Sequence, residues 1–238
     1  LTYARVRNAA DGKVFVLLES RLVQVYPDLA KPKKAADARK AFEVLSTCEG
    51  AALVGLSYTP PFDYFEALRG SVPASGAFRV ISGGWVTDDA GCGVVHCAPA
   101  FGEDDYSACL EHGIIRKGAK LVCPIDADGR FTDEVPEFAG LGVKEADRPI
   151  IKLLQSRGRI VTEAPYTHSY PFCWRSDTPL IYRAVPGTFI KVEEVRDRLV
   201  ENNKQTYWVP SFVKEKRFHN WLENARDWSV SRNRFWGT

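Results

Sequence analysis

The chain has 238 residues, a length that suits one large domain or one domain with an appendage. Its 32 basic and 30 acidic residues give a formal net charge of +2, which is too small to indicate nucleic-acid binding by itself. Six cysteines at irregular spacings, with no Cys-x-x-Cys pair, exclude the disulfide framework of a small secreted domain and favour the reducing cytoplasm. No apolar run approaches the roughly 20 residues that cross a bilayer, so we expect no membrane contact. The chain contains no methionine and begins in strand-like sequence, so we expect it to be part of a larger protein.

The first part of the chain predicts several short strands. The strand-like runs are residues 2–7, 13–19, 53–58 and 77–81. Asp11 and Gly12 predict a hairpin turn between the first two runs. The intervening sequence predicts an extended or short helical piece at residues 22–26 and a solvated loop or short helix at residues 31–40. RNA binding by the lysines and arginine of residues 31–40 is a second interpretation. Residues 69–76 predict a loop.

The densest cluster of reactive side chains is the stretch AGCGVVHCAPAFGEDDY at residues 90–106. Residues 93–98 predict a short buried strand that ends at Pro99. The three acids at residues 103–105 predict the first turn of a helix that runs to His112, because acids complement the exposed N–H groups there. One loop therefore joins the imidazole of His96 to a carboxylate cluster that suits an ammonium group. In the alternative interpretation, the acids only cap the helix and His96 is a core residue.

The second part of the chain predicts more helix and then changes character. The helix signals are residues 144–157, 193–203 and 218–228, and the strand signals are residues 161–164, 180–185 and 188–192. Residues 126–129 predict a tight turn between strands rather than a calcium loop, because the later calcium ligands are missing. From residue 166 the sequence is aromatic and rich in Pro and Arg. Cys173 has no partner cysteine nearby, so we expect no metal. Together these patterns predict a compact mixed α/β domain built around a β-barrel-like sheet.

The central stretch resembles the editing domain of isoleucyl-tRNA synthetases, in which a Gly-x-Gly-x-Val-His-x-Ala-Pro strand precedes a Gly-x-x-Asp loop. Three further stretches resemble landmarks of the same family in the same order. They are PPFDYF at residues 60–65, HSYPFCWRSDTPL at 168–180 and WSVSRNRFWGT at 228–238. Their details are similar to eukaryotic cytosolic members. The resemblance implies a barrel-like editing domain of class Ia synthetases at residues 1–165 and an α/β return segment towards the synthetic core at residues 166–238.

The resemblance also implies a function, the hydrolysis of valine from the isoleucine tRNA. Isoleucine and valine differ by one methylene, which a pocket rewards by only about 1 to 3 kcal/mol; isoleucyl-tRNA synthetases are the standard example of this limit. A second site that excludes isoleucine and removes valine is therefore needed. By position, Asp105 matches the family's ammonium-binding aspartate, with Asp104 as the fallback if the loop register differs. His96 matches the histidine that lines the pocket. Attack by an oriented water is the simplest mechanism.

The same resemblance sets expectations for cofactors and partners. It implies no cofactor for this chain, with ATP and magnesium in the synthetic core of the whole enzyme. It implies two partners, the acceptor end of the isoleucine tRNA carrying valine and the rest of the synthetase polypeptide. The family's threonine-rich peptide is not found in this sequence. A non-catalytic module that positions tRNA or binds a partner is the alternative function. Residues 232–236 are expected either to contact tRNA or to pack against the synthetic core.

Overall fold

The computed structural model describes residues 1–70 and 76–231. The chain forms two compact units, Leu1–Ala184 and Val185–Thr238, and each is considered by itself. The boundary expected from the sequence, between the editing domain at residues 1–165 and the return segment at residues 166–238, concerns function and not compactness, and it stays a prediction. Residues 71–75 of the expected loop at 69–76, and the expected contact segment at 232–236, lie outside the described residues.

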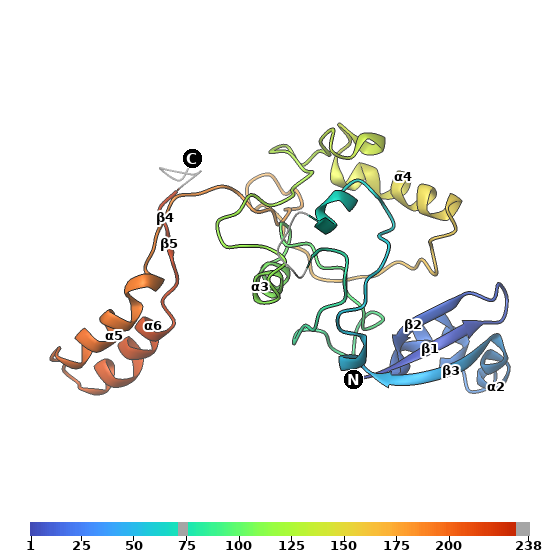
Figure 1. Cartoon of the computed structure of the whole chain (residues 1–238), viewed down its shortest axis with the longest axis horizontal. Helices are drawn as coiled ribbons and strands as arrows, with labels where there is room; N and C mark the ends of the chain where they lie inside the picture. The colour runs from blue at the N-terminus through green and yellow to red at the C-terminus, as the bar shows by residue number, and fades with distance from the viewer. Residues whose placement is uncertain (71–75, 232–238) are drawn as a thin grey trace. The chain divides into compact units, whose positions relative to one another are not determined.

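The first unit begins with a three-stranded antiparallel sheet in the order β2-β1-β3 (Figure 1). Its strands are β1 (Thr2–Asn8), β2 (Val14–Leu18) and β3 (Phe42–Glu49). A turn with Gly12 at φ +71° joins β1 to β2, as the sequence predicts, because glycine adopts this conformation without strain. One face of the sheet is covered by α1 (Leu22–Val25) and the segment after it, with Ala4, Val6, Leu17 and Tyr26 buried. This small core holds the start of the central stretch, as described below.

Two longer helices follow in the first unit. They are α3 (Glu103–Glu111) and α4 (Val143–Ser156), and both agree with the helices expected from the sequence. Gly158, at φ +63°, ends the turn after α4. The short helix α2 (Ala35–Ala38) lies in the charged segment and has no buried residue, which fits the expected short helix. Short 3-10 helices lie at Glu19–Arg21, Pro27–Ala30, Arg39–Ala41, Gly50–Leu53, Glu66–Gly70 and Pro136–Phe138.

Several strands that the sequence predicts are not formed. Residues 93–98 form an extended segment without a partner strand, and Val94 and Val95 are 53% and 54% exposed instead of buried. Residues 53–58 and 77–81 lie beside each other around one bridge, between Ser57 and Arg79, with backbone hydrogen bonds of 2.8–3.0 Å on either side of it, but they form no regular strand. Residues 161–164 and 180–185 form no strand. A β-branched run becomes a regular strand only where a neighbouring chain supplies a continuous ladder of hydrogen bonds, and none of these segments has such a ladder in the part of the chain that the structure describes.

The architecture is therefore mixed α/β with small sheets. The described residues contain one three-stranded and one two-stranded sheet, and neither closes into a barrel. The expected turn at residues 126–129 is confirmed. Asp126 Oδ1 accepts the N–H groups of Asp128 and Arg130, both at 2.9 Å, and Ile125 bridges to Phe131 across the turn. No helix in the described ranges is long and apolar enough to span a membrane.

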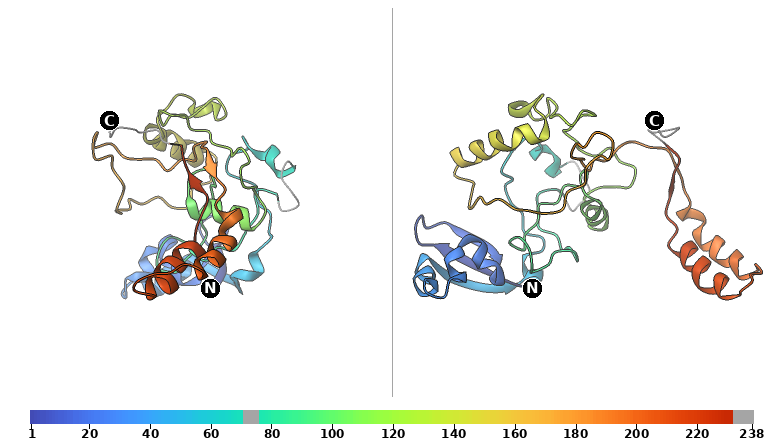
Figure 2. Two further views of the ribbon diagram at one scale, coloured as in Figure 1. Left: turned by 90° about the vertical axis from the view of Figure 1, so that its left-hand side faces the viewer. Right: turned by 180° about the vertical axis from the view of Figure 1, so that it is seen from behind.

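The second unit is a small helical hairpin with a short sheet. Helices α5 (Arg196–Lys204) and α6 (His219–Glu223) lie side by side in Figures 1 and 2. The 3-10 helix Glu193–Val195 leads into α5, and a π-helix, Val213–Phe218, leads into α6. Strands β4 (Phe189–Ile190) and β5 (Trp228–Ser229) pair antiparallel. The expected helices at 193–203 and 218–228 are present but displaced: α5 begins later, and the second helix begins earlier, as the π-helix, and stops at Glu223.

Candidate functional site

The central stretch is fixed to the sheet at its start. The Leu18 amide donates to the Cys92 carbonyl at 2.9 Å, and the Tyr3 hydroxyl donates to the Gly93 carbonyl at 2.7 Å. Arg21 Nε donates to the Gly91 carbonyl at 3.0 Å. Gly93 has φ +78°, and a Cβ there would overlap the buried side chain of Leu18. Only glycine fits at this position, so the backbone enters the candidate site at a fixed point.

The other end of the stretch is fixed by Asp105. The residue is the third of α3, and its carboxylate Oδ2 accepts the backbone N–H of Ala98 at 2.9 Å. Gly102 precedes the helix with an extended backbone, and a Cβ there would lie 3.0 Å from the same oxygen. The glycine therefore leaves room for the carboxylate to reach back over the turn. Asp105 is half-buried, whereas Glu103 and Asp104 are exposed, so it is the most buried acid of this turn.

His96 lies between these two anchors and is exposed. It stands two residues before Ala98, and two residues of extended chain span about 7 Å. The backbone therefore keeps the imidazole near the residue that Asp105 binds. The alternative interpretation of His96 as a core residue is wrong, because its side chain is exposed.

Cys97 and Cys109 form a thiol pair beside Asp105. Their sulfur atoms lie 3.8 Å apart, and Cys97 Sγ lies 3.7 Å from the Asp105 carbonyl oxygen. Burial, together with the neighbouring Cys109 and Asp105, raises the pKa of the Cys97 thiol to about 12. The thiol is therefore protonated at neutral pH and is a poor nucleophile. The sequence does not single out Cys109, which is one of the buried residues of α3.

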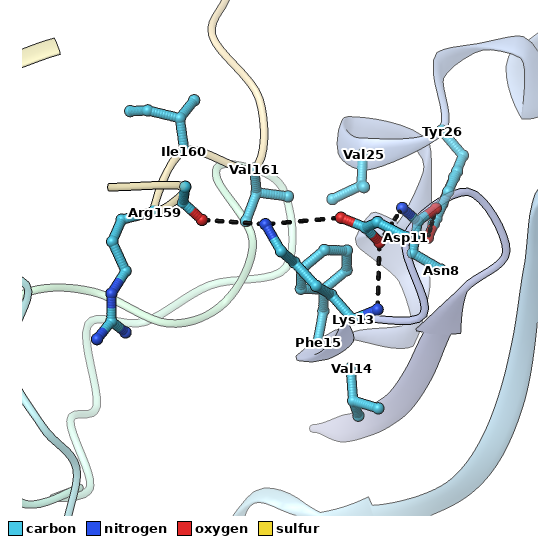
Figure 3. Close-up of a pocket in the computed structure, with 11 residues that line it drawn as sticks. Asn8, Asp11, Lys13, Val14, Phe15, Val25, Tyr26, Arg159, Ile160 and Val161 are labelled. Atoms are coloured by element: carbon cyan, nitrogen blue, oxygen red, sulfur yellow. Dashed lines mark hydrogen bonds and ion pairs between the residues drawn. The ribbon is translucent and has the colours of Figure 1, made fainter. Parts of the chain in front are cut away.

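The first unit contains a cavity of about 420 Å³ between the hairpin and the chain that follows α4 (Figure 3). Lys13 Nζ donates to the Gly158 carbonyl at 3.0 Å and lies 3.6 Å from Asp11. Asn8 donates to Asp11 at 2.7 Å and accepts from the Tyr26 hydroxyl at 3.3 Å. The Asn8 and Lys13 hydrogen bonds hold the pKa of Asp11 below its usual value. The polar side chains that line this cavity are therefore hydrogen-bonded or ion-paired to one another and to the Gly158 carbonyl. We interpret them as groups that hold the hairpin to the chain after α4 and not as a ligand site.

A second cavity, of about 450 Å³, is lined by Pro60, Pro61, Asp63, Arg157 and Arg159. Neither set of lining residues includes Asp105 or His96. The structure thus brings Asp105 and the chain carrying His96 together, but does not place them on either of these two cavities.

The described part of the chain contains no group of three His, Cys, Asp or Glu side chains arranged to hold a metal ion. Cys173 lies in a turn in which its amide donates to the Thr178 carbonyl at 2.8 Å. None of the six cysteines forms a disulfide in the described residues.

The sequence that forms this site matches a known protein family. The family model for class I tRNA synthetases (I, L, M and V) matches residues 9–238. The chain belongs to this family of class I tRNA synthetases. Within it, the similarity to isoleucyl enzymes that the sequence indicates is confirmed by individual relatives.

Three relatives illustrate the similarity to class I tRNA synthetases. The cytoplasmic isoleucine–tRNA ligase of Arabidopsis thaliana is 51% identical over 99% of this chain and 21% of its own length. The cytoplasmic isoleucine–tRNA ligase of Mus musculus is 48% identical over 100% of this chain and 18% of its own length. The isoleucine–tRNA ligase of Bdellovibrio bacteriovorus is 49% identical over 100% of the chain and 21% of its own length. The chain therefore spans about a fifth of the length of the relatives it matches.

Proposed function

We propose that this chain is the editing segment of an isoleucyl-tRNA synthetase, which hydrolyses valine from the isoleucine tRNA and excludes isoleucine. The observation that carries the proposal is the anchoring of Asp105. One carboxylate oxygen is held by the Ala98 amide at 2.9 Å, in the loop that carries His96. A carboxylate fixed in this way presents its second oxygen, Oδ1, at a defined place beside the loop. A fixed anion is what an aminoacyl ester, with its ammonium next to the carbonyl, needs for orientation.

In the proposed reaction, Asp105 binds the ammonium of the valyl group and so places the ester carbonyl for attack by water. A bond forms between the water oxygen and the carbonyl carbon, and the bond from that carbon to the ribose oxygen breaks. The ribose oxygen takes a proton, and valine leaves as the free acid. His96 lines the aminoacyl pocket, where its ring leaves space for valine and not for the extra methylene of isoleucine.

The proposal needs no covalent intermediate. Cys97 Sγ lies 3.7 Å from the Asp105 carbonyl oxygen, but burial, together with Cys109 and Asp105, raises the pKa of its thiol to about 12, so it is a poor nucleophile. Positioning of a water contributes several kcal/mol, and well-oriented reactions reach about 7 to 11 kcal/mol. Orientation by Asp105 is therefore the main catalytic contribution that we assign to this chain.

The remaining parts of the proposal follow from the family. We propose that the chain uses no cofactor of its own, that ATP and magnesium act in the synthetic core, and that the enzyme works in the cytoplasm. The partners are the acceptor end of the isoleucine tRNA carrying valine and the rest of the synthetase. The barrel-like form of the editing domain belongs to the same proposal. It requires the extended segment at residues 93–98 to gain a partner strand.

A second candidate is a non-catalytic module that positions tRNA or binds a partner. It is favoured by one observation: the linings of the two cavities of about 420 and 450 Å³ include neither Asp105 nor His96. In this interpretation, Asp105 only ties α3 to Ala98.

Hydrolysis of valyl-tRNA by a full-length synthetase that carries this sequence separates the two candidates. Asp105→Asn keeps an oxygen that accepts the Ala98 N–H but removes the charge, whereas Asp105→Ala removes both. We expect both variants to lose at least about tenfold in the rate, because a charged hydrogen bond to the ammonium is lost. Asp104→Ala, one residue earlier and exposed, is the matched control and should hydrolyse normally.

The outcomes are distinct. Normal hydrolysis by Asp105→Asn with a loss in Asp105→Ala would mean that the residue only anchors the loop. Loss in Asp104→Ala alone would move the ammonium contact to the fallback residue. Normal hydrolysis by all three variants would leave the positioning module as the function.

A further inference from the structure

Two cysteines from different elements of the first unit meet beside the candidate site. Cys97 lies in the extended segment at residues 93–98, and Cys109 is a buried residue of α3. Their sulfur atoms lie 3.8 Å apart, close to van der Waals contact. The sulfur atoms of a disulfide lie about 2.05 Å apart, so an approach of about 1.8 Å would bring these two to bonding distance.

The segment that carries Cys97 can make this approach. The fold holds the segment at its two ends, through the Gly93 carbonyl and the Ala98 amide. Between these points the backbone forms no regular strand, and Val94 and Val95 are more than half exposed. A backbone without a ladder of hydrogen bonds shifts more easily than a helix, so we assign most of the approach to Cys97.

The surroundings of the two thiols make them slow to react. Cys97 is half-buried and Cys109 is 3% exposed, so Cys97 is the sulfur that a small oxidant reaches first. Burial, together with Cys109 and Asp105, raises the pKa of the Cys97 thiol to about 12, and burial also raises the pKa of Cys109. Because the thiolate is the reactive form, the pair stays reduced during brief contact with an oxidant and responds to sustained contact.

The position of the pair couples it to Asp105. Asp105 and Cys109 are four residues apart in α3, about one turn, so they lie on the same side of the helix. Cys97 directly precedes Ala98, whose amide donates to Asp105 Oδ2 at 2.9 Å. A bond between the two sulfurs would therefore close a loop that contains both partners of this hydrogen bond. Movement of Cys97 towards α3 would displace Ala98 relative to Asp105.

We propose that Cys97 and Cys109 are a redox modification site, which forms a reversible disulfide and so changes how the loop holds Asp105. With hydrogen peroxide as the oxidant, the deprotonated Cys97 sulfur attacks one peroxide oxygen and the O–O bond breaks, which gives a sulfenic acid and one water. The Cys109 sulfur then attacks the Cys97 sulfur, the S–O bond breaks, and the departing hydroxide takes the Cys109 proton as a second water. The thiols lose two electrons and two protons, and a dithiol reductant reverses the bond by exchange.

The bond itself is tested by mass spectrometry of the whole chain after sustained exposure to hydrogen peroxide and alkylation of the remaining thiols. Chymotrypsin cuts after Phe101 and Tyr106 separate Cys97 from Cys109, so we expect peptides joined by a disulfide that dithiothreitol releases. Cys97→Ala and Cys109→Ala should each abolish the joined peptides. Cys92→Ala removes another cysteine of the same stretch and is the matched control, which should keep them. No joined peptides from the parent chain, Cys92 joined to Cys109, or sulfinic acid at Cys97 in their place would overturn the proposal.

The effect of the bond on the site rests on the proposed hydrolysis and is measured with a full-length synthetase that carries this sequence. A misplacement of about 1 Å can cost about a hundredfold in rate, so we expect peroxide to slow hydrolysis of valyl-tRNA at least about tenfold. Dithiothreitol should restore the rate, and Cys97→Ala should keep its rate in peroxide. Far-ultraviolet circular dichroism checks that each variant remains folded.

The outcomes separate the two proposals. Equal rates of the reduced and the cross-linked parent enzyme, or an equal loss in Cys97→Ala, would overturn control of the site by this bond. A reduced parent enzyme that does not hydrolyse valyl-tRNA would overturn the proposed hydrolysis, whereas the joined peptides would still establish the disulfide between Cys97 and Cys109.

Discussion

At the scale of single residues, the candidate site depends on two glycines as much as on its reactive groups. Gly102 leaves space for the Asp105 carboxylate, and Gly93 lets the chain pass against Leu18 before it turns towards His96. Both positions need glycine because the Leu18 side chain approaches Gly93 closely and the Asp105 carboxylate approaches Gly102. The positions of Asp105 and His96 thus depend on residues that take no part in the chemistry.

A pair of substitutions separates the two constraints at the start of the stretch. Gly93→Ala must accommodate both φ +78° and an overlap with Leu18, whereas Gly91→Ala has φ +61° and nothing within 4 Å of the new methyl group. A left-handed backbone costs about 1 to 2 kcal/mol for alanine, and overpacking adds about 1 to 3 kcal/mol. We therefore expect Gly93→Ala to lower the free energy of unfolding by about 2 to 5 kcal/mol and Gly91→Ala by about 1 to 2 kcal/mol. Urea denaturation measures both, and equal losses would show that Leu18 moves aside freely.

At the scale of elements, the sequence predicts those parts whose stability is local. The apolar face of α4, the acids in the first turn of α3 and the Asp11–Gly12 turn each contain their own signal, and all three are found. β3 was missed because its sequence, FEVLSTCE, alternates weakly and is paired only through β1. Residues 93–98 were wrongly expected as a buried strand, because a β-branched run does not show whether a partner chain lies beside it.

The candidate site also contains parts with a local sequence signal and parts that depend on distant residues. The helical turn that carries Asp105 was predictable, since acids favour a helix N-terminus. The bond from the Ala98 amide to Asp105, and the pairing of Cys97 with Cys109, were not, because they join residues whose proximity depends on how the loop folds back. Sequence patterns therefore located the reactive groups, and only the folded chain showed which of them meet.

The second unit offers a test of how a buried polar residue joins two elements. Asn203 bonds α5 to the π-helix through the Lys214 carbonyl at 3.1 Å and receives the Thr206 hydroxyl at 3.0 Å. Asn203→Ala leaves buried groups unpaired, so we expect a loss of about 1 to 3 kcal/mol in the free energy of unfolding. Asn202→Ala, its exposed neighbour on the same helix, should change stability by less than about 0.5 kcal/mol. Thermal denaturation followed by circular dichroism at 222 nm measures the Tm of each variant. Equal Tm values for Asn203→Ala and Asn202→Ala would contradict this expectation.

At the scale of the whole chain, the question is where one folding unit ends and the next begins. The compact units meet after Ala184, whereas the family resemblance places the functional boundary after residue 165. Residues 162–188 lie across both positions and contain little regular structure, with one bridge between Phe172 and Pro179. The Ala184 amide nevertheless donates to the Ala100 carbonyl at 2.7 Å, so the end of this region is attached to the first unit.

Limited digestion with chymotrypsin distinguishes the two boundaries. Within residues 162–188, Tyr166 and Trp174 are 78% and 77% exposed in backbone without helix or strand, so we expect the first cuts of this region there. Tyr182 directly precedes two residues that are held to the first unit, Arg183 through the Ile125 carbonyl at 3.2 Å and Ala184 through the Ala100 carbonyl at 2.7 Å. It should therefore be cut later, although its side chain is exposed. Mass spectrometry of the early fragments identifies the sites. First cleavage at Tyr182 would show that residues 166–184 are attached to the first unit more firmly than their irregular backbone indicates, and would favour the boundary after Ala184. Early cuts at Tyr166 followed by a stable fragment that begins there would favour the boundary after residue 165.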